Sequence, residues 1–435
     1  MVQTVKAIKG NVIYAESWTE IKVFLRSYIV YSGAKVQGIY TQLPKEFKNI
    51  AVTDYGEALI IPGFIDLHTH AAQFMQRGIG LDKELINWLT GHTFPTEKEF
   101  NNKSHAESIY RLFVEELLRK GTTRASILAT VHKESTDLLG EIATEKGLGA
   151  LIGKINMDQN CPSYMKEDTQ KSICDTEELL CKYKDNSLVQ TIITPRFVPT
   201  CSEQLLSGLG KLADRYRAPV QSHLSENRDE VIWVKDLYPQ HKTYADVYDA
   251  YGLLGQTPTL MAHCIFLEES EVTLLANRNV VAVHCPQANM NLASGLMPAR
   301  SWRERGVQIG LGSDVGAGHE LSMNKIMVQA IQNSKLLKAI EIDVEKQTKP
   351  LTFQETFYMA TKGNGMFFNS LASYQDQDLR VGSLEAGYAF DALVVDNCDE
   401  GNTTLSIEER LQQFLYIGDD RHIIQRYING KMIEI

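Results

Sequence analysis

Short apolar runs that each end in a histidine or an aspartate restrict the fold of this chain more than any other feature. The run Ile61–His70 ends in two histidines separated by one residue, His68-Thr69-His70. Side chains two positions apart on a strand share a face, so both rings can approach one ion. Similar runs end at His223, His263 and Asp314. Burying several ionisable groups together requires a compensating partner, so these runs predict one metal-centred site.

Between residues 62 and 375 such runs alternate with longer segments of helical period, such as Ser108–Lys120, Thr176–Tyr183 and Gln204–Tyr216. Eight candidate strands end at or near His70, Ala129, Asp158, Arg196, His223, His263, His284 and Asp314. The alternation predicts an α/β fold with a parallel (β/α)8 barrel of the TIM type over residues 62–375. An open doubly wound sheet is the alternative. The barrel is favoured because the polar residues fall at strand carboxyl ends, where barrel active sites are built.

The two flanks, residues 1–61 and 376–435, differ from this pattern. They contain short β-like runs with turn residues between them, including Asn11-Val12-Ile13-Tyr14 and Ala392-Leu393-Val394-Val395. Strands that are separated by turns and are not followed by helices are typical of an all-β unit. We therefore expect the flanks to pack together as one small composite β-sandwich domain beside the barrel.

Composition excludes some classes of partner. The formal net charge of −10 argues against a nucleic-acid backbone or an anionic membrane as the main partner. No uninterrupted apolar stretch is long enough to span a bilayer, and the first residues read as a strand, which predicts a cytoplasmic protein.

Cysteine usage points to the same compartment. The seven cysteines are Cys161, Cys174, Cys181, Cys201, Cys264, Cys285 and Cys398. Their number is odd and they form no Cys-x-x-Cys pair, as expected of free thiols in a reducing compartment. Cys264 and Cys285 lie in strand-like runs, where a buried apolar role is favoured over metal ligation. None of the seven is assigned to the metal.

The ligand set predicted for the metal is His68, His70, His223 and Asp314. Imidazole nitrogen and carboxylate oxygen suit a divalent first-row metal, and an open position for water makes such a site catalytic. A bound cation can lower the pKa of water from about 15.7 to about 7, which favours hydrolytic attack on an unsaturated carbon. These ligand types accept zinc, our first choice, and also iron.

Glu226 is the predicted proton carrier. It lies three residues beyond His223, past the end of the strand, where its carboxyl group can face the same cavity without binding the metal. The alternative is that Glu226 caps, or forms a salt bridge with, the helix that begins near Asn227-Arg228-Asp229-Glu230. Asp314 can accept a proton from the water, and His263 can donate to the attacking group or to the developing charge.

These residues resemble a known superfamily. His68-Thr69-His70 after Pro62-Gly63, with His223, His263 and Asp314, is similar to the metal-dependent amidohydrolases over essentially the whole chain. Further stretches resemble the guanine deaminase family: His70-Ala71-Ala72-Gln73, Trp88-Leu89-Thr90, Thr93-Phe94-Pro95, Thr194-Pro195-Arg196-Phe197, Ser222–Glu230 and Tyr416–Arg421. The Ser222–Glu230 stretch and the Pro195-Arg196-Phe197 element are specific, whereas His-x-His and Ser-Asp occur across the superfamily.

The resemblance implies hydrolytic deamination of guanine to xanthine and ammonia, with attack of metal-activated water at C2 and Glu226 as proton shuttle. It implies a zinc-type site in a barrel with a composite β domain, and a homodimer. The implied substrate-binding residues are His70, Gln73, Arg196, Phe197, His223, Glu226 and Asp314, with Trp88 and Leu89 as candidate walls of the pocket. For Trp88 a core role is an equal alternative, because Leu85, Trp88 and Leu89 lie at helical spacing.

Some points remain open in the sequence. The predicted fourth strand ends in Thr194-Pro195-Arg196 rather than in the lysine that bridges two metals in related enzymes, and the nearest strand-end lysine is Lys154, so one metal is favoured. His284 fits a substrate-side or a structural role equally. The rival functions are deamination or dechlorination of another amino-heterocycle (8-oxoguanine, cytosine or a triazine), and a non-catalytic scaffold of the dihydropyrimidinase type. Arg196-Phe197 is the feature that favours guanine.

Overall fold

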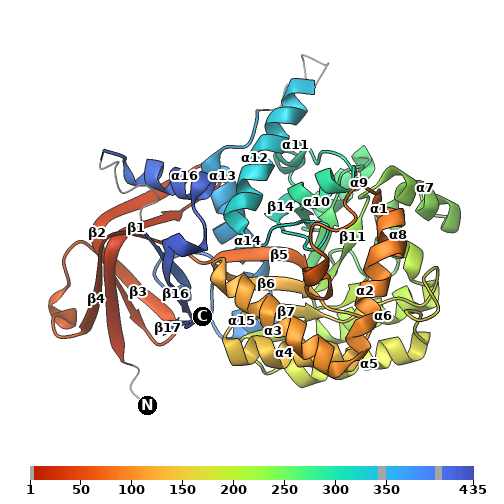
Figure 1. Cartoon of the computed structure of the whole chain (residues 1–435), viewed down its shortest axis with the longest axis horizontal. Helices are drawn as coiled ribbons and strands as arrows, with labels where there is room; N and C mark the ends of the chain where they lie inside the picture. The colour runs from red at the N-terminus through yellow and green to blue at the C-terminus, as the bar shows by residue number, and fades with distance from the viewer. Residues whose placement is uncertain (1–3, 341–348, 397–403) are drawn as a thin grey trace.

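The computed structural model describes residues 4–340, 349–396 and 404–435. Strands from the two ends of the chain lie together at one side, and the α/β segments between them form the larger part (Figure 1). The three uncertain segments include Cys398, so the expectation of a free thiol there lies outside the described residues.

The flanks form one mixed sheet. Its strands are β1 (Val5–Ala15), β2 (Ile21–Ser32), β3 (Lys35–Tyr40), β4 (Ala51–Pro62), β15 (Ala392–Val395), β16 (Ile423–Ile428) and β17 (Lys431–Met432), in the order β17-β16-β15-β4-β1-β2-β3. The two flanks join where β15 pairs antiparallel with β4, with Ala392 opposite Pro62 and Val395 opposite Leu59. The described strands thus make a single seven-stranded sheet, and the sandwich arrangement stays a prediction.

The C-terminal flank also contains a helix that the β-like pattern did not predict. Helix α16 (Ile407–Ile417) begins after Ser406, whose side chain accepts from the backbone N–H of Glu409 while the Glu409 carboxylate accepts from Ser406. This reciprocal capping satisfies two N–H groups at the start of the helix. Leu411, Phe414 and Leu415 form its buried face.

All pairs among the described strands of the central region are parallel. These strands are β5 (Phe64–His70), β6 (Thr122–Leu128), β7 (Gly149–Gly153), β8 (Ile155–Asn156), β9 (Val189–Thr191), β10 (Thr194–Pro195), β11 (Val220–Leu224), β12 (Thr259–His263), β13 (Val281–His284) and β14 (Gln308–Leu311). The third and fourth predicted strands are therefore each divided into two short strands.

The parallel strands pair in separate groups. One sheet runs β5-β6-β7-β9, another runs β11-β12-β13-β14, and β8 pairs with β10. A bridge between Ile193 and Val220 links the first group to the second, and the N–H of Asp314 donates to the carbonyl of His68 at 2.8 Å across the remaining gap. The order is that of a TIM-like barrel, while continuous closure of the barrel stays a prediction.

Sixteen α-helices accompany these strands in the described part of the chain. Besides α16 they are α1 (Leu85–Trp88), α2 (Phe94–Lys98), α3 (Lys103–Arg119), α4 (Lys133–Lys146), α5 (Thr169–Tyr183), α6 (Glu203–Tyr216), α7 (Arg228–Leu237), α8 (Tyr244–Ala250), α9 (Glu269–Asn277), α10 (Pro286–Asn291), α11 (Ala299–Glu304), α12 (Met323–Ile340), α13 (Phe353–Tyr358), α14 (Asn364–Asn369) and α15 (Ala372–Asp376).

Two predicted helices begin earlier than their apolar pattern indicated. Helix α3 starts at Lys103 because Asn102 accepts a hydrogen bond from the N–H of His105 at 3.1 Å. Helix α5 starts at Thr169 because Asp168 accepts from the N–H of Lys171 at 2.9 Å. A polar first turn carries no apolar period, so in these helices only the capping residue marks the beginning.

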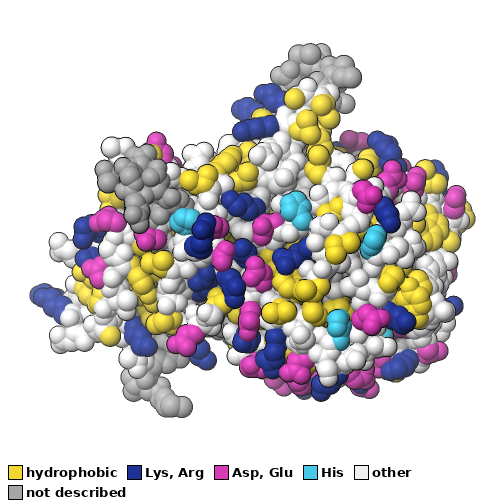
Figure 2. Space-filling view, viewed as in Figure 1, with side chains coloured by type: hydrophobic (Ala, Val, Ile, Leu, Met, Phe, Trp, Pro, Cys, Tyr) yellow, Lys and Arg dark blue, Asp and Glu magenta, His cyan; other side chains and the backbone are white. Residues whose placement is uncertain are grey.

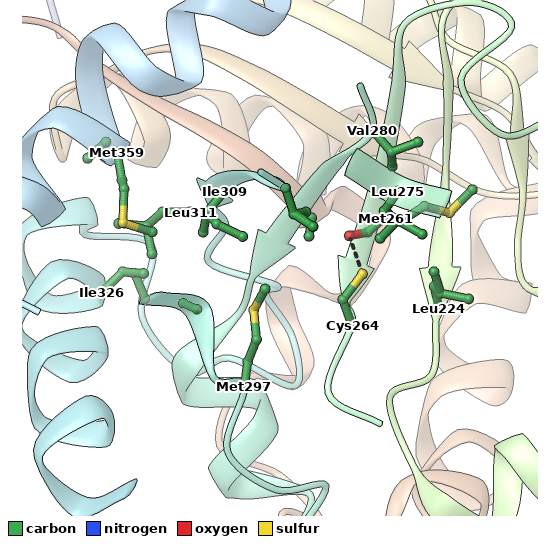
Figure 3. Packing of buried hydrophobic residues seen from close by; sticks show 14 of the residues in the cluster. Leu224, Met261, Cys264, Leu275, Val280, Met297, Ile309, Leu311, Ile326 and Met359 are labelled. Carbon is green, nitrogen blue, oxygen red and sulfur yellow. Dashed lines mark hydrogen bonds between the residues drawn. The ribbon is translucent and has the colours of Figure 1, made fainter. Parts of the chain in front are cut away.

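Alternate residues of the strands enter different buried clusters. On β12, Met261 packs in the cluster that includes helices α6 and α12, whereas Leu260 and Ala262 belong to another cluster. This is the period of two expected of a strand buried on both faces. Figure 3 shows part of the first cluster, in which Leu224, Met261, Ile309 and Leu311 from the strands pack with Met297, Ile326 and Met359. The strands that carry the candidate ligands are therefore held in place by packed hydrophobic side chains on both faces.

The surface matches the ordinary composition of the chain. Figure 2 shows acidic and basic side chains interspersed over the face that it displays, with hydrophobic side chains scattered among them. Among the described helices, none is sufficiently long and apolar to cross a membrane.

A buried ion pair connects the flanking sheet to the central region. Arg124 on β6 is fully buried and donates from Nε to Asp391 Oδ2 at 2.7 Å, from Nη1 to the Tyr374 hydroxyl at 2.9 Å and from Nη2 to Asn429 Oδ1 at 2.8 Å. Replacing Arg124 by Met leaves the Asp391 carboxylate without its cation. We expect the free energy of unfolding to fall by about 3–5 kcal/mol in urea titrations.

Arg111→Met is the control for this prediction. Arg111 forms ion pairs with Glu107 and Glu145 at the surface, and its side chain is 37% exposed. Partly exposed pairs of this kind contribute less than about 1 kcal/mol. Equal losses in the two variants would contradict a special contribution of the buried pair.

Candidate active site

The carboxyl ends of β5 and β11 and the segment after β14 bring the four predicted metal ligands together. One donor atom each of His68, His70, His223 and Asp314 lies within 4.8 Å of the others. Asp314 Oδ1 is 3.2 Å from His68 Nε2 and 3.4 Å from His70 Nε2. The Nε2 atoms of His70 and His223 are 3.3 Å apart. Four donors at these separations converge on a common point.

The protonation of these groups fits a cation. Burial, with added repulsion from neighbouring charged groups, lowers the pKa of His68, His70 and His223 well below the ordinary value of histidine, so the rings are neutral and retain a lone pair. His68 Nε2 is buried and makes no hydrogen bond with any described residue. A divalent ion would satisfy this unpartnered nitrogen and would compensate the buried carboxylate of Asp314.

Hydrogen bonds behind the rings determine which nitrogen faces the site. His223 Nδ1–H donates to the carbonyl of Arg196 at 2.6 Å, and His263 Nδ1–H donates to Asn289 Oδ1 at 2.8 Å. Each ring therefore presents Nε2 to the cluster. The carbonyl of Arg196 holds a candidate ligand in place while its guanidinium group faces the cavity.

The buried carboxylate of Asp66 binds the backbone of the two segments that carry His68 and Asp314. Its Oδ1 accepts from the N–H of His68 at 3.1 Å and from the N–H of Ser313 at 3.0 Å. Since His68 is on β5 and Ser313 follows β14, this carboxylate ties together the two segments that carry three of the four donors. Burial raises the pKa of Asp66 to about 7.

Several residues at the strand ends have left-handed backbone conformations. Ser225, His263 and Asp314 have φ values of 51°, 73° and 49°. Such conformations are costly for residues other than glycine and persist only where the surrounding structure enforces them. They turn the chain sharply after the strand, which places the side chains of His263 and Asp314 beside the other donors.

Glu226 lies close to His263 and Asp314 without joining the ligand set. Its Oε2 is 3.4 Å from His263 Nε2, and Ser294 Oγ donates to its Oε1 at 3.4 Å. Burial, together with the charges of Asp314 and Glu230, raises the pKa of Glu226 well above the ordinary range of a glutamate. A carboxyl group in this environment can hold a proton near neutral pH.

The alternative role of Glu226 as a helix cap is filled by its neighbours. Asn227 is the N-cap of α7, and its side chain accepts from the N–H of Asp229 at 2.9 Å. Glu230 Oε2 accepts from the N–H groups of Glu226 and Asn227 at 2.8 and 3.2 Å. The capping role proposed for Glu226 is therefore wrong, and its carboxyl group remains available to the cavity.

A cavity opens at the cluster. Its lining consists of His70, Gln73, Leu85, Trp88, Leu89, Arg196, Phe197, His223, Glu226, His263, Leu292, Asp314 and Ala317. Every candidate catalytic or substrate-binding residue from the sequence lies on this wall, and His68 contributes to the ligand cluster next to it. Leu85, Leu292 and Ala317 were not selected as site residues, because apolar side chains outside a recognisable motif carry no chemical signal.

Two polar groups on the wall share a partner that was also missed. Glu97 on α2 accepts from Gln73 Nε2 at 2.8 Å and from Arg196 Nη1 at 2.6 Å. Glu97 is fully buried and does not line the cavity. It lies two residues beyond Thr93-Phe94-Pro95, a stretch that resembles the guanine deaminases, but a lone acidic residue in a short helix gave no reason to select it.

The other residues left open in the sequence lie outside the cavity wall. Lys154 Nζ donates to Glu167 Oε1 at 2.5 Å and to Ser172 Oγ at 3.3 Å. Its positive charge is therefore paired with Glu167 and not with the histidine cluster. His284 is buried, and burial lowers its pKa to about 3. Cys285 Sγ lies within 4.8 Å of donor atoms of His263 and Asp314, but burial raises the pKa of its thiol, which opposes ligation as a thiolate. The described cysteines are all free.

The chain matches the Amidohydrolase family from residue 59 to residue 433. It belongs to this family.

Several proteins similar to this amidohydrolase are guanine deaminases, and the crystal structure of one of them is known. The guanine deaminase of Dictyostelium discoideum is 35% identical over 99% of this chain and 98% of its own length. The guanine deaminase of Escherichia coli K12 is 34% identical over 88% of this chain and 85% of its own length. The crystal structure of guanine deaminase from C. acetobutylicum with bound guanine in the active site is 45% identical, with a TM-score of 0.94, and the match covers 99% of this chain and 100% of that one.

Proposed function

We propose that this amidohydrolase deaminates guanine hydrolytically, which yields xanthine and ammonia. The observation that carries the proposal is one cavity in which the His and Asp cluster, the carboxyl group of Glu226 and the paired donors Gln73 and Arg196 face the same space. The solved guanine deaminase with guanine in its active site, 45% identical over essentially the whole chain, supports the choice of substrate.

We propose that His68, His70, His223 and Asp314 hold one divalent ion, zinc in the first instance and iron as the alternative. When bound, such an ion lowers the pKa of a coordinated water to about 7 and so supplies a nucleophile at neutral pH. A single ion is proposed because Lys154, the strand-end lysine nearest in sequence, is engaged by Glu167 and Ser172.

Glu226 performs the proton transfers in this proposal. Its raised pKa keeps a proton available for N3 of guanine as C2 is attacked. The carboxylate formed can then take up the proton that Asp314 accepts from the water and pass it to the departing amino group, and the hydroxyl proton released as the new carbonyl forms restores Glu226. Asp314 accepts the proton of the attacking water, and His263, held by Asn289, donates Nε2–H to the attacking oxygen when its ring is protonated. The overall change adds one water and releases one ammonia.

Substrate recognition depends on the donors opposite the cluster. Arg196 and Gln73 can bind the carbonyl oxygen and ring nitrogens at the edge of guanine, which fixes the carbon that faces the nucleophile. Phe197, Trp88 and Leu89 line the same cavity and can cover the flat ring. Trp88 also packs with Leu85 and Leu89 in a buried hydrophobic cluster, so its core role stands beside the proposed pocket role. Its indole Nε1–H donates to the carbonyl of Ile79 at 3.3 Å.

A substrate panel tests the function. Purified protein with its metal should hydrolyse guanine with a kcat/KM at least about 10⁴-fold above those for adenine, cytosine and triazines, because a wrong base leaves buried donors unpaired. A preference for 8-oxoguanine, cytosine or a triazine would establish the rival activity of the same class. Absence of metal and of any turnover in folded protein that has not met a chelator would establish the scaffold alternative.

Arg196→Lys should separate recognition from chemistry. Lysine retains the positive charge opposite Glu97 but loses the planar fork that can donate to guanine and to Glu97 together. We expect KM for guanine to rise about 10- to 100-fold, with a smaller change in kcat. Steady-state kinetics would measure both.

The control for this variant is Arg228→Lys. Arg228 is exposed and stacks on Phe266 at 4.5 Å outside the cavity, so the same chemical change should leave KM near the wild-type value. A larger fall in kcat than rise in KM for Arg196→Lys would place Arg196 in the chemical step instead.

The organisation of the chain is proposed on the same grounds. Residues 62–375 form a TIM-like (β/α)8 catalytic barrel, and residues 1–61 with 376–435 form the composite β domain, as the pairing of β15 with β4 supports. The cysteine pattern supports a cytoplasmic location, and resemblance to the guanine deaminases supports a homodimer.

A further inference from the structure

The buried Glu97 carboxylate joins the two polar recognition groups of the cavity. Its Oε1 accepts from Gln73 Nε2 at 2.8 Å, and its Oε2 accepts from Arg196 Nη1 at 2.6 Å. Gln73 and Arg196 are 2% and 3% exposed, and Glu97 is not exposed at all. One carboxylate therefore fixes the relative position of two side chains that come from different segments of the chain.

The segment that carries Glu97 also forms part of the cavity wall. Helix α1 contributes Leu85 and Trp88, a π-helical turn η3 (Leu89–Thr93) contributes Leu89, and α2 follows without interruption. Phe94 on α2 lies 5.0 Å from the Arg196 guanidinium group, measured to the ring centroid. Glu97 thus attaches this segment to Arg196 through an ion pair beside a cation–π contact.

The pairing limits what the two recognition groups can still offer. Gln73 uses one N–H on Glu97, and its carbonyl oxygen accepts from the N–H of Gly316 at 3.2 Å. One N–H and one lone pair of this amide remain for a ligand. Arg196 retains further N–H donors, but its positive charge is balanced by Glu97 at ion-pair distance. Gln73 and Arg196 together therefore offer directed donors with little net charge.

We propose that Glu97 is a positioning residue that holds Gln73 and Arg196 in their binding orientation and sets the preference of the cavity for a neutral purine over an anionic one. The inference rests on the proposed function and adds a residue to it. Glu97 itself does not touch the substrate, since it lies behind the wall.

Glu97→Gln removes the charge and keeps the size. The amide oxygen of the new glutamine can accept from only one of the two partners, and its NH₂ group faces the other donor. We expect kcat/KM for guanine to fall about 30- to 100-fold, mainly through KM, because a buried donor is left unpaired. The uncompensated Arg196 should also favour anions. The ratio of inhibition constants for urate, an anion at neutral pH, and hypoxanthine, which is neutral, should fall about tenfold.

Glu97→Asp and Glu99→Gln complete the experiment. Glu99 is an exposed neighbour, so E99Q should match the wild type in both measurements. E97D keeps the charge but shortens the reach, so its guanine KM should rise while the urate to hypoxanthine ratio stays near that of the wild type.

The outcomes are distinguishable. Equality of E97Q and E99Q in KM and in the inhibitor ratio would overturn the inference. If E97Q does not fold, an unchanged KM in E97D would overturn it, and a raised KM with an unchanged ratio would support it. Failure of the wild-type enzyme to deaminate guanine would instead remove the proposed function.

Discussion

Glu226→Gln should lower kcat for guanine by about 10²- to 10⁴-fold, the usual contribution of a general acid and base. The Glu226 carboxyl group lies 3.4 Å from His263 Nε2 in a buried position that raises its pKa. Glutamine has the same shape but cannot release or accept the proton that the reaction moves. Metal content and guanine binding should stay near wild-type values, because Glu226 is outside the ligand cluster.

Asp229→Asn provides the control for this variant. Asp229 is exposed on α7, three residues from Glu226, and undergoes the same change from carboxyl to amide without facing the cavity. Its kcat should equal that of the wild type. Turnover by Glu226→Gln within tenfold of the wild type would contradict the proton-shuttle role, and loss of metal from that variant would show that Glu226 supports the ion instead.

The cluster of candidate metal ligands could be predicted because each ligand lies at or just beyond the end of an apolar, strand-like run. His68, His223 and Asp314 each follow an apolar run, and parallel strands bring their carboxyl ends to one edge. The structure places these donors within 4.8 Å of one another without any exception among the four. Rare residue types at a repeated structural position are a strong signal even when they are far apart in sequence.

Partnerships between distant polar residues could not be predicted in the same way. Glu97 is separated by 24 residues from Gln73 and by 99 from Arg196, and nothing local to α2 indicates either contact. The same applies to Arg124 and Asp391, which are 267 residues apart. Such pairs depend on how elements pack, and a single sequence contains no record of that packing.

Apolar periodicity also failed to predict where some helices begin. The apolar period located α3 and α5 but not their first turns, which Asn102 and Asp168 determine by capping. Helix α16 was missed because the surrounding flank is rich in short β-like runs. The identity of a site therefore came from residue chemistry, and the extent of its supporting elements required the structure.

Loss of a metal ligand should have an effect at least as large as loss of the proton carrier. His223 presents Nε2 to the cluster because its Nδ1–H is held by the carbonyl of Arg196. In His223→Asn the bound metal should fall well below one ion per chain, and turnover should fall by at least about 10⁴-fold, because water at its ordinary pKa is a poor nucleophile at neutral pH. Metal analysis by mass spectrometry and guanine kinetics would measure the two effects.

His284→Asn controls for the loss of a buried histidine at a strand end that is not a candidate ligand. His284 also ends a strand and is buried, but it neither belongs to the ligand cluster nor lines the cavity. This variant should retain its ion, and removing the ion from it or from the wild type with a chelator should abolish turnover until zinc is restored. Because a ligand that binds only the folded state adds about 4 kcal/mol at a thousand times its dissociation constant, the metal-free wild type should also unfold at a lower temperature. A full metal content in His223→Asn, or its loss from His284→Asn, would contradict the ligand assignment, because the geometry gives the two histidines opposite roles.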